Sequence, residues 1–182
     1  MTDKVTVTEA LAEIVLIGKK MEKHRSFIQG HISMYDYEDD PFEKEGGTKE
    51  MNSRVIQAIT DLGQRLVRIR SLVAESNLRT VLTIGKTTLS LADWLVWRRE
   101  IAESLQQVFM GATKQANNAI SINREKPRLV PKQAEDQEQQ IAKLILNVDI
   151  PSLDKSAMEI EEILGVLDGK LSLLNATTII EI

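Results

Sequence analysis

The chain has 182 residues, which is enough for one domain with its own hydrophobic core. Its 23 Lys and Arg residues and 27 Asp and Glu residues give a net charge of −4, whereas a general nucleic-acid-binding protein would present a strongly basic face. The lack of cysteine excludes disulfides, thiolate metal sites and cysteine nucleophiles.

The first predicted helix begins at Thr6, because Thr6 and Glu9 have the spacing of a capping box. Apolar residues then recur in alternating steps of four and three, which is typical of helices packed in bundles and coiled coils. The predicted seam comprises Val7, Leu11, Ile14, Gly18, Met21, Arg25, Ile28 and Ile32. Gly18 and Arg25 weaken this seam. The Arg25 side chain is expected either to lie at the edge of the seam with its charged end in solvent or to form a buried ion pair.

An acidic loop is predicted over residues 34–47, where Asp and Glu residues crowd around one proline and two glycines. The carboxylates lack the spacing of an EF-hand, so a mobile, solvated segment is expected rather than a cation site. Tyr35, Tyr37 and Phe42 leave open that the loop folds back on a helix or on a neighbouring subunit.

Three further helices are predicted. The second runs over residues 48–76, with an apolar face of Met51, Val55, Ile59, Leu62, Leu66, Ile69 and Val73. The third runs from about Ser90 to about Ile122, and an exposed Pro-rich and polar excursion follows over residues 123–140. A short strand is predicted over residues 141–149. The last helix begins near Pro151 and ends at Asn175, with a seam of Leu153, Ala157, Ile160, Leu164, Leu167, Leu171 and Leu174. A terminal strand is predicted over residues 177–182.

These elements predict a mainly α protein in a single domain, residues 1–182. We expect an elongated antiparallel bundle of about four helices, three of them long, with short strands at a helix junction and at the C-terminus. Long helices in so small a chain leave apolar flanks, which a second copy would cover, so a homo-oligomer is expected. No signal-peptide pattern or membrane-spanning run of about 20 apolar residues is present, so we expect a cytoplasmic protein without a membrane partner.

The junction over residues 77–89 is the strongest candidate for a binding site. It combines a β-branched ribbon, a Gly85-Lys86 turn and a group of hydroxyl, amide and basic side chains. One interpretation is an anion site, in which the turn leads into a helix N-terminus with free N–H groups and a positive dipole end. The other is a type II′ hairpin whose threonines serve strand formation. The candidate ligand-binding residues are Asn77, Arg79, Thr80, Lys86, Thr87, Thr88, Trp94 and Arg98.

Catalytic motifs are lacking. The Gly-Lys-Thr-Thr segment is not a P-loop, because Thr80 occupies the position of the required first glycine. His24 and His31 stand seven residues apart on one helix and are expected to be exposed or at a subunit contact. Trp94, Trp97 and Arg98 either stack on a planar ligand or anchor the packing. We therefore expect a non-enzyme without metal or cofactor.

Three segments resemble the septicolysin-like family of small helical bacterial proteins. They are Thr8-Glu-Ala-Leu11, Asn77-x-x-Thr80-x-Leu82-x-x-Gly85-Lys-Thr87, and Val148-Asp-Ile-x-x-Leu153 with Leu167-Asp168 and Asn175-x-Thr177. The chain departs from the family pattern in its additional threonine at Thr87-Thr88 and in Arg98-Arg99-Glu100, where the family has an Arg-Asp pair. The residues 122–140 resemble an insertion. The resemblance implies a helical, multimeric fold, and the family name implies a cytolysin.

Three functions are expected from these observations. The first is a non-enzymatic homo-oligomer that binds a small anionic, nucleotide-like ligand at the junction and sequesters a signalling nucleotide, as phage counter-defence proteins do. The second is a structural or assembly protein that acts only through helix–helix contacts. The third is the membrane-active cytolysin that the family name implies, and an enzyme with an unrecognised site is a further alternative.

Overall fold

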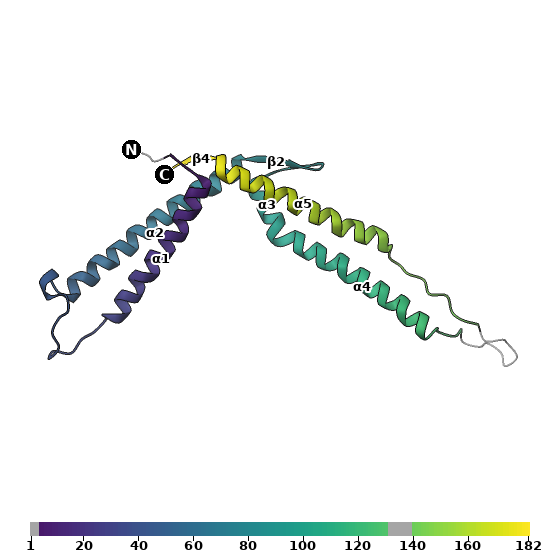
Figure 1. The fold of residues 1–182 in the computed structure, drawn as a ribbon, viewed down its shortest axis with the longest axis horizontal. Helices are drawn as coiled ribbons and strands as arrows, with labels where there is room; N and C mark the ends of the chain where they lie inside the picture. The colour runs from purple at the N-terminus through teal and green to yellow at the C-terminus, as the bar shows by residue number, and fades with distance from the viewer. Residues whose placement is uncertain (1–3, 131–139) are drawn as a thin grey trace. The chain divides into compact units, whose positions relative to one another are not determined.

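The computed structural model describes residues 4–130 and 140–182. This part of the chain is mainly α and contains four helices of more than 20 residues, whereas the sequence analysis expected three that long (Figure 1). The helical elements are α1 (Val7–Gly30), the 3-10 turn η1 (Glu43–Glu45), α2 (Thr48–Arg79), α3 (Leu91–Val96), the π-helical η2 (Trp97–Ala102), α4 (Glu103–Glu125) and α5 (Ile150–Thr177). The strands are β1 (Lys4–Thr6), β2 (Val81–Ile84), β3 (Thr87–Ser90) and β4 (Ile179–Glu181).

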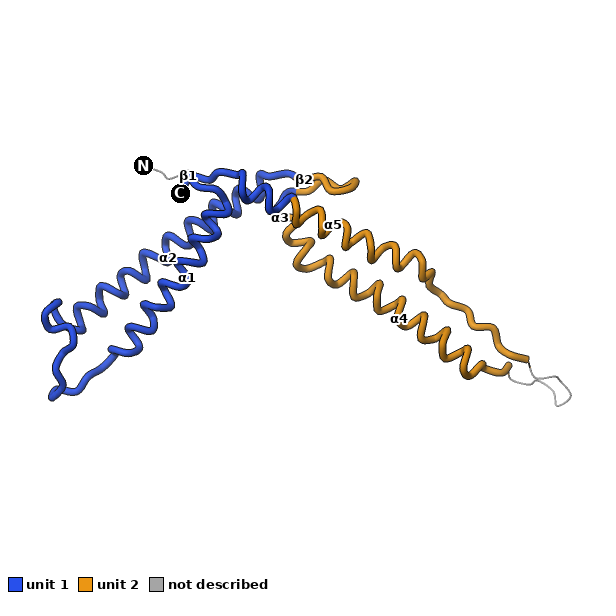
Figure 2. The backbone as a smooth tube through the Cα atoms, in the orientation of Figure 1, with its two compact units in different colours: residues 1–81, 90–92, 170–182 blue, residues 82–89, 93–169 orange. Residues whose placement is uncertain are grey.

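The contacts divide the chain into two compact units (Figure 2). Unit 1 comprises residues 1–81, 90–92 and 170–182, and unit 2 comprises residues 82–89 and 93–169. The sequence predicts one helical domain over the same length. Each unit is built around a pair of helices.

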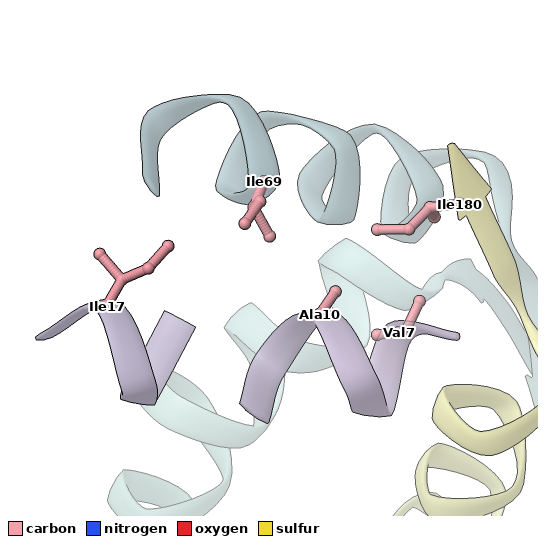
Figure 3. Close-up of a cluster of buried hydrophobic side chains, with 5 residues drawn as sticks. All are labelled: Val7, Ala10, Ile17, Ile69 and Ile180. Carbon is pink, nitrogen blue, oxygen red and sulfur yellow. The ribbon is translucent and has the colours of Figure 1, made fainter. Parts of the chain in front are cut away.

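Unit 1 is held together by an apolar cluster between α1 and α2. Figure 3 shows its five buried residues: Val7, Ala10, Ile17, Ile69 and Ile180. The predicted apolar face of α2 packs here as expected, since Leu62, Leu66 and Val73 lie against the same cluster. The predicted capping box is also confirmed, because Glu9 N donates to Thr6 Oγ1 at 3.2 Å and Thr6 N donates to Glu9 Oε2 at 2.7 Å.

The predicted seam of α1 is wrong at every second position. The buried residues are Ala10 and Ile17, whereas Leu11 and Gly18 are exposed. The seam therefore steps from Val7 by three and then four residues, not by four and then three. Both phases coincide every seventh residue, so Val7, Ile14 and Met21 belong to either. Arg25 is likewise exposed and pairs with Glu22 on its own helix at 2.7 Å, which excludes the buried ion pair.

A small sheet that the sequence analysis missed ties both ends of the described chain together. Strand β1 pairs antiparallel with β4, and the register sets Val5 opposite Ile180. The predicted C-terminal strand is thus confirmed over Ile179–Glu181. Strand β1 was not predicted, because its three residues are too few to show strand periodicity. A salt bridge of 3.3 Å between Lys4 Nζ and Glu181 Oε1 adds to the pairing.

Unit 2 places α4 beside α5 in antiparallel order (Figure 1). Arg98 of η2 pairs with Asp168 at 3.0 Å, and Thr113 Oγ1 of α4 donates to Asp154 Oδ1 at 3.0 Å. Later positions of the η2–α4 segment therefore meet earlier positions of α5. The predicted seam of α5 is confirmed by the burial of Ile160 and Leu167. The last helix ends two residues later than predicted, at Thr177.

The strand predicted over residues 141–149 is wrong. Its only ladder contact in the described chain is an isolated bridge between Ile141 and Leu129, and Ile145 is 73% exposed. In the described chain this β-branched run has no second strand beside it and no core to cover. It therefore stays extended without joining a sheet. The predicted excursion at 123–140 lies partly outside the described residues, and α4 extends to Glu125.

Candidate functional site

In unit 1, the predicted site residues Asn77 and Arg79 lie in the last turn of α2, which extends three residues further than predicted. The Arg79 guanidinium forms an ion pair with Glu75, one turn earlier. The Thr80 amide and hydroxyl both donate to the Ser76 carbonyl, at 3.0 Å and 2.9 Å. Arg79 and Thr80 therefore serve the end of this helix.

A cavity of about 290 Å³ lies beside this helix end, and its wall includes two of the predicted site residues. It is lined by Leu72, Glu75, Ser76, Arg79, Thr80, Ile179 and Ile180. The C-terminus of a helix is the negative end of its dipole, and the Glu75 carboxylate adds a negative charge. Both disfavour an anion, and Arg79 carries the only positive charge among the lining side chains.

In unit 2, the Gly85-Lys86 turn joins β2 to β3 in a two-stranded sheet. Gly85 has φ of 59°, and no described residue other than glycine has a positive φ, so Lys86 has a negative one. These signs match the first and second positions of a type II′ turn. Of the two interpretations left open above, the structure therefore shows the hairpin.

The anion site expected at this turn lacks its helix N-terminus. The four residues of β3 separate Lys86 from Leu91, where α3 begins, and extended residues advance about 3.3 Å each. Thr88 instead shares a hydrogen bond of 2.8 Å with Thr83 across the hairpin. Lys86 and Thr87 are exposed.

Trp94 and Arg98 also have structural contacts within unit 2. Trp94 is 2% exposed, its Nε1 donates to the Leu82 carbonyl at 3.1 Å, and its ring meets Trp97 edge to face at 5.5 Å. A buried ring with its N–H occupied anchors the hairpin to the helix and cannot stack on a ligand without moving. Arg98 pairs with Asp168 of α5. The predicted residues thus fall partly in unit 1 and partly in unit 2, and most of them stabilise their own unit.

The loop between α1 and α2 carries organised contacts that the sequence analysis did not predict. Asp40 accepts hydrogen bonds from the Thr48 amide at 2.8 Å, the Thr48 hydroxyl at 2.6 Å and the Phe42 amide at 2.8 Å. These bonds, led by that of the Thr48 side chain, lower the pKa of the Asp40 carboxyl from its ordinary value. The carboxylate also lies at the N-terminus of α2, the positive end of its dipole. A helix-capping signal eight residues before the helix is not one that a short motif reveals.

An aromatic group completes this loop. The rings of Phe27, His31 and Phe42 meet at 4.5 to 5.4 Å, so Phe42 does fold back on α1. His31 Nδ1 lies 2.8 Å from the Phe27 carbonyl, and the Asn52 amide donates to the His31 carbonyl at 2.8 Å. His31 is therefore a partly buried structural residue within one chain.

Beside the loop lies a cavity of about 460 Å³, lined by His31, Ile32, Ser33, Met34, Asp40, Thr48, Lys49, Asn52, Ser53 and Ile56. Its volume lies within the range of small-molecule sites. Asn52 Oδ1 is buried without a hydrogen-bond partner, but its negligible exposure means that it does not open to the cavity. Seven of its ten lining residues are polar, but Asp40, Thr48 and Asn52 already bond within the loop.

The helices also expose large apolar side chains. Among the described residues, 13 apolar side chains are buried and 27 large ones are exposed. No described helix is long and apolar enough to cross a membrane, and residues 4–130 and 140–182 hold no cluster of three or more side chains suited to a metal ion.

Comparison of the chain with protein-family models, curated proteins and solved structures found no match. The resemblance to the septicolysin-like family accordingly stays a prediction.

Proposed function

We propose that the protein is a non-enzymatic homo-oligomer that assembles through the apolar faces of its long helices. The observation that carries this proposal is the ratio of exposed to buried apolar side chains, which is about two to one in the described residues. Singly exposed apolar residues are ordinary, but 15 of the 27 exposed ones lie on the helices, and repeated apolar positions along a helix are typical of surfaces that another chain covers.

The total accessible area supports the same proposal. Two compact proteins of half the 20.5 kDa mass would expose roughly 5,300 Å² each, or roughly 10,700 Å² together. The chain exposes 13860 Å², so even two separate units of ordinary compactness would expose roughly 3,000 Å² less. A standard interface covers roughly 800 Å² on each partner, which is less than this difference.

Native mass spectrometry of the purified protein tests this proposal. The expected spectrum shows a defined multiple of 20.5 kDa, because each copy covers apolar surface of another. A spectrum that contains only the single chain across micromolar concentrations, with full helicity in the same sample, would overturn the proposal.

A second candidate function is the binding of a small anionic, nucleotide-like ligand at the junction. Two separate observations favour it: the cavity beside Arg79 and Thr80 in unit 1, and the exposed Lys86 on the hairpin of unit 2. Two features disfavour anion binding beside Arg79. They are the ion pair of Arg79 with Glu75 and the negative end of the α2 dipole. The same mass spectrum separates the two functions, since a retained ligand adds its own mass to each copy.

A further inference from the structure

We infer that a second copy of the chain docks antiparallel on one face of α4, an inference that rests on the proposed homo-oligomer. This face, called the outer seam, begins at the end of η2 and follows α4 in steps of four and three. It comprises Ile101, Leu105, Val108, Ala112, Gln115, Ala119 and Ile122.

The helix α4 has two other seams. One faces α5, and the other is exposed and mostly polar. The inner seam is displaced by one residue and faces α5: Ala102 and Ala116 are buried there, and Thr113 bonds to Asp154. The third seam is fully exposed and mostly polar, with Glu103, Gln107, Met110, Lys114, Asn117, Ser121 and Arg124. The outer seam is apolar like the inner one but lacks its partner.

The exposure of the outer seam is large for aliphatic side chains. Ile101 is 45% exposed, Val108 60% and Ile122 55%. Leu105 is 36% exposed, and Gln115 is the only polar member. A sustained four–three repeat of this kind is the pattern by which helices pack side by side.

The charge pattern identifies the occupant as another copy of the same chain. The seven outer-seam residues and their neighbours Ser104, Gly111 and Asn118 include no charged side chain, although 27% of the chain is charged. Two copies that each carry a charge of −4 repel one another overall. A charge-free strip is where such copies can meet without setting like charges together.

Gly111 gives an independent reason for a close neighbour. A glycine inside a helix lowers helix stability relative to alanine, so it usually serves a purpose. In the described chain a Cβ built on Gly111 would meet no atom within 4 Å, as is also true of Gly63, Gly165 and Gly169, so no contact described here requires a glycine at that position. Together with Ala112 and Ala119 it makes a shallow strip that lets a second helix approach closely.

The order of large and small residues sets the direction of pairing. If a two-fold axis passes near residue 110, Ile101 of one copy lies opposite Ala119 of the other, and Val108 lies opposite Ala112. Two of the bulky side chains then meet alanines, while Leu105 lies opposite Gln115, and the two-fold axis repeats each contact, which makes the pairing isologous. A parallel pair would set Val108 against Val108 and leave the alanines facing each other across a gap.

Sedimentation velocity of charge variants tests the face. Val108→Lys places an ammonium in the outer seam and is expected to give a smaller species than the wild type. Gln107→Lys, on the neighbouring exposed position, is the matched control and should keep the wild-type species. If Val108→Lys, with unchanged helicity, sediments as the wild-type oligomer, this inference is overturned while the homo-oligomer stands. A wild type that is itself monomeric contradicts both.

Cysteine cross-linking keeps the inference testable if Val108→Lys fails to fold. The chain has no cysteine, so any disulfide reports an introduced pair. When Val108→Cys and Ala112→Cys copies are mixed and oxidised, the mixed dimer should exceed both like dimers, because these positions face each other in the antiparallel pair. A predominance of Val108→Cys dimers would refute antiparallel pairing. Absence of all three dimers would refute the face.

Discussion

Substitution of Ile69 by alanine provides the most direct test of how unit 1 is held together. Ile69 is 0% exposed and lies between α1 and α2, with Val7, Ala10 and Ile17 in the same cluster. Alanine removes three carbon atoms from this site. The neighbouring helices are joined by loops and strands at both ends, so they close the resulting cavity only in part.

The expected loss of unfolding free energy is about 3 kcal/mol, within the 2–5 kcal/mol range for large-to-small core changes. For a protein of this length, that corresponds to a fall of roughly 6–12 °C in melting temperature. Val67 lies on the same helix but is 66% exposed, so Val67→Ala is the matched control and should change stability by less than about 0.5 kcal/mol.

Thermal unfolding followed by circular dichroism at 222 nm measures both variants. Each sample is run at several protein concentrations, because assembly would make the melting temperature depend on concentration. Equal, small shifts for Ile69→Ala and Val67→Ala would refute the packing of α1 on α2 as the source of stability.

Three further predictions concern the loop, the hairpin and the helix pair of unit 2. Asp40→Ala should lower the melting temperature near pH 7. Because the pKa of Asp40 is lowered in the fold, the stability that its carboxylate contributes is present above the unfolded-state pKa and is lost as the pH falls through the folded-state pKa. In a pH series of melting curves, the difference between the variant and the wild type should therefore shrink toward pH 3. A difference that stays constant with pH would contradict that role. Lys86→Ala should leave the melting temperature unchanged, and, if the second candidate function holds, calorimetry against a panel of nucleotides and cyclic nucleotides should show a roughly ten- to hundredfold loss of affinity. Thr113→Val should cost about 1 kcal/mol in denaturant unfolding by removing the bond to Asp154, and no cost would argue against that contact between α4 and α5.

The fold could be predicted where periodicity extends over many turns. The apolar faces of α2 and α5 repeat without ambiguity, so their buried residues Ile69, Ile160 and Leu167 followed from spacing alone. The phase of the buried seam of α1 could not be predicted from spacing, because residues 10 and 11 are both apolar and only packing decides which of them is buried. The polar or small residues at positions 18 and 25 were the signal that the neighbouring phase, through Ile17, was the buried one.

The candidate site could be predicted less well, because the sequence shows side-chain chemistry but not how a side chain is already occupied. Arg79, Thr88 and Arg98 look like ligand-binding groups until their partners Glu75, Thr83 and Asp168 are seen. The bond from Trp94 to Leu82 is likewise a tertiary contact that no local motif encodes. The outer seam was hidden for a different reason: two seams that differ by one residue overlap along α4, and the sequence alone shows one broad apolar face.

The central claim is that copies of the chain cover each other's apolar helix faces. Sedimentation equilibrium of the wild type over a dilution series from about 100 µM to below 1 µM tests it most directly, since it measures molar mass without reference to shape. The account predicts a multiple of 20.5 kDa at the higher concentrations, with dissociation, if any, only on dilution. A molar mass of one chain throughout, from protein whose helicity is intact, would contradict it.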